Sequence, residues 1–337
     1  MPSKATCVLL LLLAMVAVAH GQIEDFATTN FTKADSVAQL YPQYSLRDMH
    51  GLARKLSEPL STDVEKFRAI YLWTCLNIEN DYYLFRENQI KRARLKDAQE
   101  VAKWNKKFYP IVMEALLKKH RTVCTGYAYL IRELALHAGL SCVMIDGYGR
   151  TSQANVGGDA KPNHSWNAVR LNGKWYLCDA TWSSGAIDMG KREFSKSYND
   201  TYFLLEPHLF IANHYPVDSA WTLTREKPTL LEFLQKPLVY SGALQHKIYG
   251  FEPETFTIHV ERGRPTTFRF KDRGHLALDK VELQIKAYGT SSLFPKEFRQ
   301  TPDGYISVEH VFTSRGHLIL HLLVNGTYVS SYTVDVD

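Results

Sequence analysis

The sequence predicts an α+β fold in which a mixed helical and antiparallel-sheet region is followed by a β-sandwich-like domain. Three observations support this prediction. A capping box, Thr62-Asp63-Val64-Glu65, opens an amphipathic helix. Asn172-Gly173 separates two apolar runs, which is a strong signal for a β-hairpin. From about Lys236 onward the apolar period changes from helical to strand-like.

The length of 337 residues and the hydrophobic content of 45% suit one large or two ordinary domains. We predict a segment 22–45 that is polar and loosely structured, a first domain over 46–235, and the β-sandwich-like domain over 236–337. The strand-like runs of the second domain are 255–260, 266–270, 281–287, 305–311, 318–324 and 328–336.

The first 21 residues have the pattern of a secretory signal peptide. Lys4 precedes an apolar run from Val8 to Ala19, and small residues lead to a cleavage site near Gly21-Gln22. The run is shorter than the roughly 20 apolar residues that a membrane span needs. We therefore expect a secreted, extracellular protein without a membrane span.

Two of the predicted elements carry the features on which the site prediction depends. The capping-box helix places Val64, Phe67, Ile70 and Tyr71 on one face, which we expect to lie in the core. A second helix follows Cys124, with apolar residues at helical spacing and Gly139 as a stop signal. Unpaired backbone N–H groups at a helix N-terminus lower the pKa of a thiol, so Cys124 is well placed for a nucleophile.

The hairpin register brings a histidine and an aspartate together. With Asn172-Gly173 as a two-residue turn, Leu171 faces Lys174, Trp166 faces Asp179 and His164 faces Thr181. His164 and Asp179 then lie on one face as diagonal neighbours, with Cα atoms about 7–8 Å apart. A one-residue slip would move Asp179 to the opposite face.

Cys124, His164 and Asp179 are therefore candidates for a nucleophile, its base and an orienting carboxylate. A thiol attacks as thiolate, so it needs a base, and the base needs a partner that holds its ring. Taken singly, a cysteine in apolar surroundings is more often a core residue, and an aspartate near a turn is more often a local cap. The joint pattern favours the triad.

These motifs resemble the transglutaminase-like superfamily, and within it the kyphoscoliosis peptidase and hillarin branch. The resemblance extends from about Leu46 onward and rests on Ala69–Trp73, Thr122–Tyr127, Asn163–Asn167, Cys178–Trp182, Tyr202–Leu204, Phe210-Ile211 and His214–Pro216. It implies a papain-like catalytic core in which Cys124 is the nucleophile, His164 the base and Asp179 the orienting carboxylate. The sequence lacks an acidic calcium-loop pattern, so it gives no basis for calcium activation.

The remaining cysteines, charges and histidines point to no cofactor, metal or nucleic acid. Cys75, Cys142 and Cys178 are either core thiols or, for the last two, a disulfide. The basic tract 86–107 is typical of solvated helix faces. His317 and His321 would share a strand face, but no third metal ligand accompanies them.

Four Asn-x-Ser/Thr sequons suggest a glycoprotein, with Asn30, Asn199 and Asn325 as the candidates for glycan attachment. A glycan on Asn163 would block the cleft beside His164, so we expect that residue to be bare. The segment from Gly149 to Pro162 is predicted to be a loop that gates the site.

Two functions fit the sequence. In the first, the protein is an enzyme that transfers acyl groups of protein substrates through a thioester, as a peptidase or a transglutaminase-like acyltransferase. In the second, it is an extracellular matrix or adhesion module whose triad is idle. The sequence does not determine the substrate or the oligomeric state.

Overall fold

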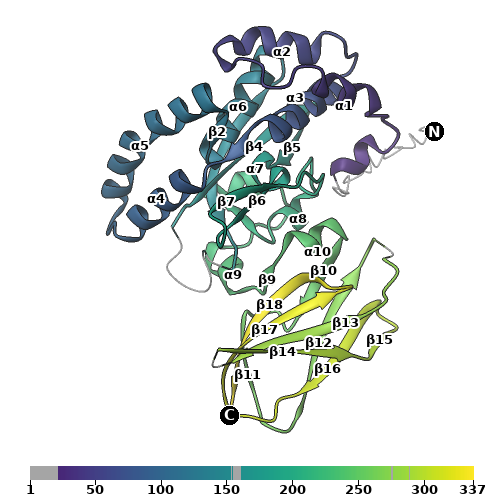
Figure 1. Ribbon diagram of the computed structural model, residues 1–337. Helices are drawn as coiled ribbons and strands as arrows, with labels where there is room; N and C mark the ends of the chain where they lie inside the picture. The colour runs from purple at the N-terminus through teal and green to yellow at the C-terminus, as the bar shows by residue number, and fades with distance from the viewer. Residues whose placement is uncertain (1–21, 153, 155–160, 275, 288) are drawn as a thin grey trace, which may run out of the picture.

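The computed structural model describes residues 22–152, 154, 161–274, 276–287 and 289–337. Helices lie at one end of the molecule, a four-stranded sheet lies in the middle, and the C-terminal strands lie at the other end (Figure 1). This arrangement confirms the predicted α+β fold, with a mixed helix and sheet core followed by a C-terminal sheet region.

Four helices form the core of the first part: α1 (Thr32–Gln39), α2 (Met49–Ser57), α3 (Asp63–Asn77) and α6 (Cys124–His137). The predicted capping box is present on α3, where the Glu65 carboxylate accepts the Thr62 N–H at 3.0 Å and Thr62 Oγ1 accepts the Glu65 N–H at 3.3 Å. Because α3 is covered on all sides, its residues Phe67, Ile70, Tyr71 and Trp73 are fully buried. The helix is therefore the centre of this core.

The segment 22–45 differs from the loose structure that its polarity suggested. It forms a short 3₁₀ helix, Gln22–Phe26, and α1. Phe26 packs on Tyr176 with ring centroids 5.2 Å apart, and the small residues of α1 are buried against α3. Asp35 of α1 also accepts a hydrogen bond from the buried Arg68 at 2.6 Å. A second ion pair joins Asp25 to Lys174 at 2.6 Å, so a few apolar anchors and ion pairs order a mostly polar segment.

Helices α4 (Tyr82–Ala93) and α5 (Ala98–Lys119) form a hairpin on one side of the molecule (Figure 1), and the C-terminal part of α5 packs into the main core through Leu116. A two-residue parallel pairing of β1 (Glu79–Asn80) with β2 (Arg121–Thr122) joins the two ends of this hairpin. The hairpin has a small apolar cluster of its own, built on Leu95, Trp104, Phe108 and Val112 and extended by Val123, the residue before Cys124.

The central sheet is antiparallel, in the order β5-β4-β3-β8. Its strands are β3 (Cys142–Gly149), β4 (His164–Leu171), β5 (Lys174–Cys178) and β8 (His214–Pro216). Asn172 and Gly173 have φ values of 49° and 81°, so both central residues of the β4–β5 turn are left-handed, as the type I′ turn requires.

The hairpin register is confirmed from Leu171–Lys174 to Asn167–Cys178, and it ends there. The predicted pairs Trp166–Asp179 and His164–Thr181 are wrong because β5 stops at Cys178. Asp179 instead caps the short helix α7 (Ala180–Ser184), which carries Thr181 away from the sheet. His164 and Asp179 still meet, because the first residue of β4 lies next to the N-cap residue of α7.

The C-terminal strands form two sheets whose apolar faces meet. One has the order β10-β12-β16-β15 and the other β11-β18-β17-β13-β14, with β9 paired to β18. Phe268 of the first sheet and Tyr332 of the second are buried with ring centroids 5.3 Å apart. The six predicted strands correspond to β11 (Thr257–Val260), β12 (Pro265–Asp272), β13 (Val281–Ala287), β16 (Tyr305–Val311), β17 (Gly316–Val324) and β18 (Thr327–Val336).

Further strands of this region were not predicted, among them β10 (Ile248–Glu252), β14 (Thr290–Lys296) and β15 (Phe298–Gln300). The edge strand β14 is almost wholly exposed, so it lacks the apolar alternation that marks a strand. The pairing of β11 with β18 is parallel, in a region predicted to be antiparallel. The remaining short elements are β6 (Gly185–Asp188), β7 (Glu193–Lys196), α8 (Pro207–Phe210), α9 (Leu230–Gln235), β9 (Leu238–Val239) and α10 (Ser241–Gln245).

The predicted signal peptide, residues 1–21, lies outside the described residues, and so does half of the predicted gate, at 153 and 155–160. Secretion and gating therefore stay predictions. In the described part of the chain, no helix has both the length and the apolar character needed to cross a membrane. Cys75, Cys124, Cys142 and Cys178 are all free thiols, so Cys142 and Cys178 form no disulfide.

The sequon side chains differ in how they are engaged. Asn30 is exposed and Asn199 is partly exposed, and each accepts a backbone N–H two residues later. The amide nitrogen of Asn325, where a glycan would attach, donates to the Ala277 carbonyl at 2.8 Å. Asn163 bonds through both amide atoms to the backbone of Gly149. A glycan on Asn325 or Asn163 would have to displace these bonds.

Candidate active site

Cys124 is the first residue of α6 and is partly exposed in a cleft of about 800 Å³. The N-cap residue Val123 makes no side-chain cap, so the first N–H groups of α6 are not used by a capping side chain. The cleft is also lined by α4 and α5 on one side and by Val217 and Trp221 on another. The thiol thus lies where a helix dipole favours negative charge and where a substrate has access.

His164, the first residue of β4, links Cys124 to Asp179. Its Nε2 lies 2.7 Å from Asp179 Oδ2, and both side chains are buried. The ring also hydrogen-bonds to the thiol of Cys124, and because Nε2 is engaged by Asp179, Nδ1 is the nitrogen left for that bond. The three residues predicted from the sequence are therefore brought together in one hydrogen-bonded chain.

Asp179 uses its two carboxylate oxygens for different partners. Oδ1 accepts the backbone N–H groups of Thr181 at 2.8 Å and Trp182 at 3.3 Å, which makes it the N-cap of α7. Oδ2 faces the histidine. The local-cap interpretation and the orienting-carboxylate interpretation of this residue are thus both right, one for each oxygen.

The electrostatics of the three groups follow from burial opposed by close partners. Burial alone would raise the pKa of Cys124, but the hydrogen bond and charge of His164 and the backbone N–H of Ser165 lower it below its usual value. Burial alone would lower the pKa of His164, but Asp179 and Cys124 raise it to about 10. The pKa of Asp179 falls well below its usual range, because the two histidines outweigh its burial. The lowered pKa of Cys124 and the raised pKa of His164 favour a thiolate beside an imidazolium.

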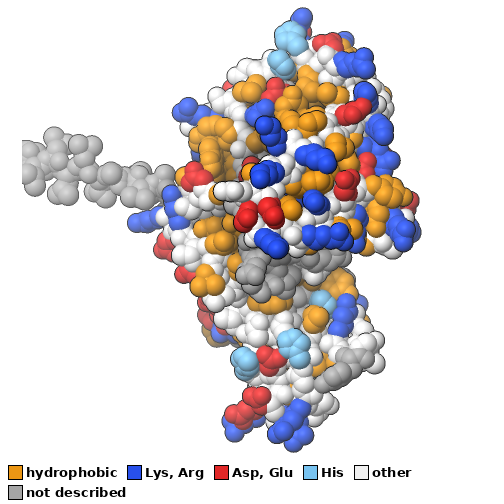
Figure 2. Space-filling view, turned by 90° about the vertical axis from the view of Figure 1, so that its left-hand side faces the viewer, with side chains coloured by type: hydrophobic (Ala, Val, Ile, Leu, Met, Phe, Trp, Pro, Cys, Tyr) orange, Lys and Arg blue, Asp and Glu red, His pale blue; other side chains and the backbone are white. Residues whose placement is uncertain are grey.

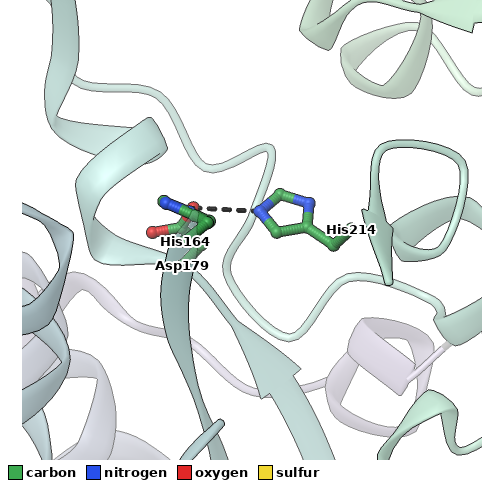
Figure 3. A group of neighbouring side chains, drawn as sticks. All are labelled: His164, Asp179 and His214. Carbon is green, nitrogen blue, oxygen red and sulfur yellow. Dashed lines mark hydrogen bonds and ion pairs between the residues drawn. The ribbon is translucent and has the colours of Figure 1, made fainter. Parts of the chain in front are cut away.

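A second histidine, His214, completes the group and was not predicted as a site residue. It is the first residue of β8 and is fully buried, and its Nε2 lies 3.1 Å from Asp179 Oδ2. Figure 3 shows its ring directed at Asp179, beside His164. The sequence places it 35 residues from Asp179 with no motif spacing between them, so only the resemblance of His214-Tyr215-Pro216 to the family drew attention to it.

The ring of His214 is enclosed by aromatic side chains. Trp182 and Phe210 lie with ring centroids 4.2 Å and 4.3 Å from it. Its Nδ1 lies 2.7 Å from the side-chain oxygen of Asn213, whose amide nitrogen donates to the Tyr202 hydroxyl at 3.0 Å. Burial in this enclosure lowers the pKa of His214 to about 4, against the opposing effect of Asp179. His214 is therefore neutral at physiological pH and has a single N–H. It donates to the carboxylate when Nε2 carries that proton and the Asn213 amide is turned so that its N–H₂ group faces Nδ1.

His164, Asp179 and His214 could also be considered as metal ligands, since one atom of each lies within 4.8 Å of the others. The separations of 2.7 Å and 3.1 Å are those of hydrogen bonds. Donor atoms on one tetrahedral zinc ion would lie roughly 3.3 Å apart. The geometry therefore fits a hydrogen-bonded network better than a metal centre.

A cysteine at a helix start, joined to a strand histidine and a buried aspartate, defines a transglutaminase-like site. The family model of the transglutaminase-like superfamily matches residues 50–180, which include Cys124, His164 and Asp179. The chain carries a domain of this superfamily, in the branch that includes kyphoscoliosis peptidase and hillarin.

Three curated relatives support this assignment. Kyphoscoliosis peptidase of Mus musculus is 31% identical over 77% of this chain and 38% of its own length. The Homo sapiens protein of the same name is 32% identical over 70% of this chain and 36% of its own length. Hillarin of Drosophila melanogaster is 26% identical over 67% of this chain and 27% of its own length. The chain thus matches less than two fifths of each relative.

The first prediction concerns the thiol of Cys124. Because its pKa is lowered and that of His164 is raised to about 10, the thiolate–imidazolium pair should be populated at near-neutral pH and lost as His164 deprotonates near pH 10. Iodoacetamide should therefore alkylate Cys124 rapidly well below the pH at which an ordinary thiol reacts. Mass spectrometry of the modified residues against pH would measure this.

In His164→Ala the burial of Cys124 is no longer opposed by the imidazole, so alkylation should slow and shift to higher pH. Cys142 and Cys178 are internal controls, because burial raises the pKa of the first to about 12 and that of the second well above its usual value. An identical alkylation curve with and without His164 would contradict the pairing.

The second prediction concerns His214. His214→Phe fills the aromatic enclosure but removes the donor to Asp179, whose pKa should rise and whose carboxylate should hold His164 less firmly. We expect a loss of about 1–3 kcal/mol in the free energy of unfolding and slower alkylation of Cys124. His214→Gln, which retains an N–H donor, should recover part of both. Chemical denaturation and alkylation rates would measure the two effects, and an unchanged alkylation rate in His214→Phe would show that the residue serves packing alone.

Proposed function

We propose that this chain is a cysteine-dependent acyl-transfer enzyme that acts on protein substrates. The observation that carries the proposal is the hydrogen-bonded chain Cys124–His164–Asp179, with its thiol end open to a cleft and its carboxylate end buried. The word peptidase in the name of two relatives supports hydrolysis as one outcome. Because the chain matches only part of those relatives, the activity is proposed from the site itself.

In the proposed reaction, the Cys124 thiolate attacks the carbonyl carbon of a peptide bond or of a glutamine side chain. The first N–H groups of α6 stabilise the oxyanion of the tetrahedral intermediate. A carbon–sulfur bond forms, the carbon–nitrogen bond breaks, and the His164 imidazolium gives its proton to the leaving amine. Asp179 holds the ring through this step and stabilises its charge.

The thioester is then resolved by a second nucleophile. His164, now neutral, takes a proton from water or from an amine, and that nucleophile attacks the thioester carbonyl. The carbon–sulfur bond breaks and Cys124 is regenerated as thiolate. Water gives hydrolysis, and a primary amine gives a new amide bond.

A binding module remains the second candidate. It is favoured by the edge strand β14, which exposes Leu293 and Phe294 at the side of the C-terminal sheet. Exposed edge strands pair readily with a further strand. In this case the protein would act in a matrix or adhesion assembly, and Cys124 would contribute nothing to function.

The third prediction separates the two candidates. Cys124→Ser preserves the start of α6 but replaces a readily ionised thiol with a hydroxyl, so turnover of a glutamine-containing peptide should fall by on the order of a thousandfold or more. Cys142→Ala removes a buried thiol outside the cleft and should retain turnover.

Product formation with water alone and with an added primary amine, followed by mass spectrometry, distinguishes hydrolysis from transamidation. A thioester adduct on Cys124 in the wild type, absent from Cys124→Ser, would be direct evidence. If Cys124→Ser and Cys142→Ala function equally well, the binding module is favoured.

We also propose that this activity is exported, on the basis of the signal-peptide pattern of residues 1–21. The fourth prediction is that the chain expressed with residues 1–21 in a eukaryotic secretion-competent cell appears in the medium with an N-terminus near Gln22. N-terminal sequencing of the secreted and cell-retained protein tests this. Retention of the intact chain in the cell would refute export.

A further inference from the structure

Arg92, in the basic tract that was interpreted as a solvated helix face, lies in the same cleft as Cys124 and His164. It belongs to the last turn of α4 and is only partly exposed. Its Nη1 donates to the side-chain oxygen of Asn105 of α5 at 2.7 Å, and its Nη2 donates to the Pro162 carbonyl, two residues before His164. The guanidinium is therefore held between the helical hairpin and the strand that carries the histidine.

The positive charge of Arg92 has no ion-pair partner in the part of the chain that the structure describes. Among the described residues, no carboxylate lies within ion-pair distance of its guanidinium, whereas Arg132, which also lines the cleft, pairs with Glu133 at 2.6 Å. Asp146 in the same cleft accepts a hydrogen bond from Ser165 at 2.6 Å. Burial lowers the pKa of Arg92, and the charges of Cys124 and Asp146 partly oppose this, so the group stays charged next to the nucleophile.

A guanidinium has five N–H donors in one plane, a geometry that matches a carboxylate. The two neutral acceptors, Asn105 and Pro162, orient the group without neutralising it. A half-buried, oriented cation with no carboxylate at ion-pair distance in the described part of the chain is stabilised further by a ligand of opposite charge. A carboxylate is therefore the ligand group that matches Arg92 in charge and geometry.

The helices on which Arg92 lies extend this charge over the surface. Residues 82–119 contain ten Lys or Arg and four Asp or Glu, a net charge of +6, while the whole chain has a net charge of +5. The remainder of the chain is therefore close to neutral. Figure 2 shows Lys and Arg side chains gathered on the face that α4 and α5 present. A field of this kind attracts acidic segments toward the adjoining cleft.

We propose that the site takes acidic protein segments, and that Arg92 binds a carboxylate next to the acyl group that Cys124 attacks. This substrate class rests on the proposed acyl-transfer function and deepens it. The carboxylate has two sources, an Asp or Glu side chain beside the acyl residue or the free C-terminus of the substrate. Arg92 gives local recognition, and the remaining charge of α4 and α5 gives long-range attraction that salt weakens.

The experiment measures binding to Cys124→Ser, so that it does not depend on turnover. The probes are fluorescein-labelled peptides that share one glutamine and differ beside it in Glu or Gln, each made with a free or an amidated C-terminus. We expect the Glu peptide or the free-acid peptide to bind about tenfold more tightly than its neutral counterpart, the difference expected for a charge-assisted hydrogen bond. The pair that shows the difference identifies the source of the carboxylate.

In the Cys124→Ser background, Arg92→Gln should bind the acidic peptide and its neutral counterpart almost equally, so that the ratio of the two affinities falls to near one. Arg94→Gln is the matched control, because Arg94 is exposed, two residues away and outside this cleft, and removes the same charge. It should preserve most of the ratio. Equal loss in the two variants would reduce the effect to the general field of the helices and would overturn the role of Arg92, as would an unchanged ratio in Arg92→Gln.

Two further measurements keep the outcomes distinct. If Arg92→Gln fails to fold, as judged by its thermal melt, Arg92→Lys takes its place, since lysine keeps the charge but loses the planar donors, and it should reduce the ratio without abolishing it. Turnover of the same peptides by the wild type is measured separately. If the acidic peptides bind more tightly but none is turned over, acyl transfer is rejected and the acidic ligand is retained. If the peptides are turned over but the acidic ones bind no more tightly, acyl transfer is retained and the acidic ligand is rejected.

Discussion

The buried carboxylate of Asp179 is the interaction on which the rest of the site depends. A charge removed from water costs several kcal/mol unless hydrogen bonds replace its hydration. Asp179 is almost fully buried and receives two backbone N–H groups at one oxygen and two imidazoles at the other. The four donors come from three places: the start of α7 gives both N–H groups, and the starts of β4 and β8 give one imidazole each. Three elements are thus brought together by the need to satisfy one side chain.

The two imidazoles have different roles although they share an oxygen. His164 faces the thiol and is raised in pKa, so it holds a proton that can be given to a leaving group. His214 lies in an aromatic enclosure that lowers its pKa to about 4, so it stays neutral and donates one hydrogen bond. A second charged histidine would compete with His164 for the same carboxylate. The apolar surroundings of His214 prevent this and leave the charge of Asp179 to be shared with His164 alone.

Much of this site could be predicted from local chemistry, and the failures have physical causes. The Asn-Gly turn sets a register that the structure follows as far as Cys178, and the helical spacing after Cys124 gives α6 its start. The exit of Asp179 into a helix was missed because an aspartate that caps and an aspartate that orients look alike in a sequence. His214 was missed because tertiary packing alone brings it to Asp179. The same holds for Arg92, whose environment depends on a helix pairing that no periodicity in the basic tract reveals.

The catalytic residues and the proposed carboxylate-binding residue Arg92 lie on different parts of the chain. The nucleophile, base and carboxylate stand on α6, β4 and the end of β5, which pack into the main core. Arg92 stands on a helical hairpin with its own apolar cluster, closed at its base by the two-residue pairing of β1 and β2. Substitutions on the exposed face of the hairpin can therefore alter the charge at the cleft without changing the packing beneath the triad. Two connections limit this separation: Leu116 of α5 is buried in the main core, and Val123 belongs to the hairpin cluster and precedes Cys124.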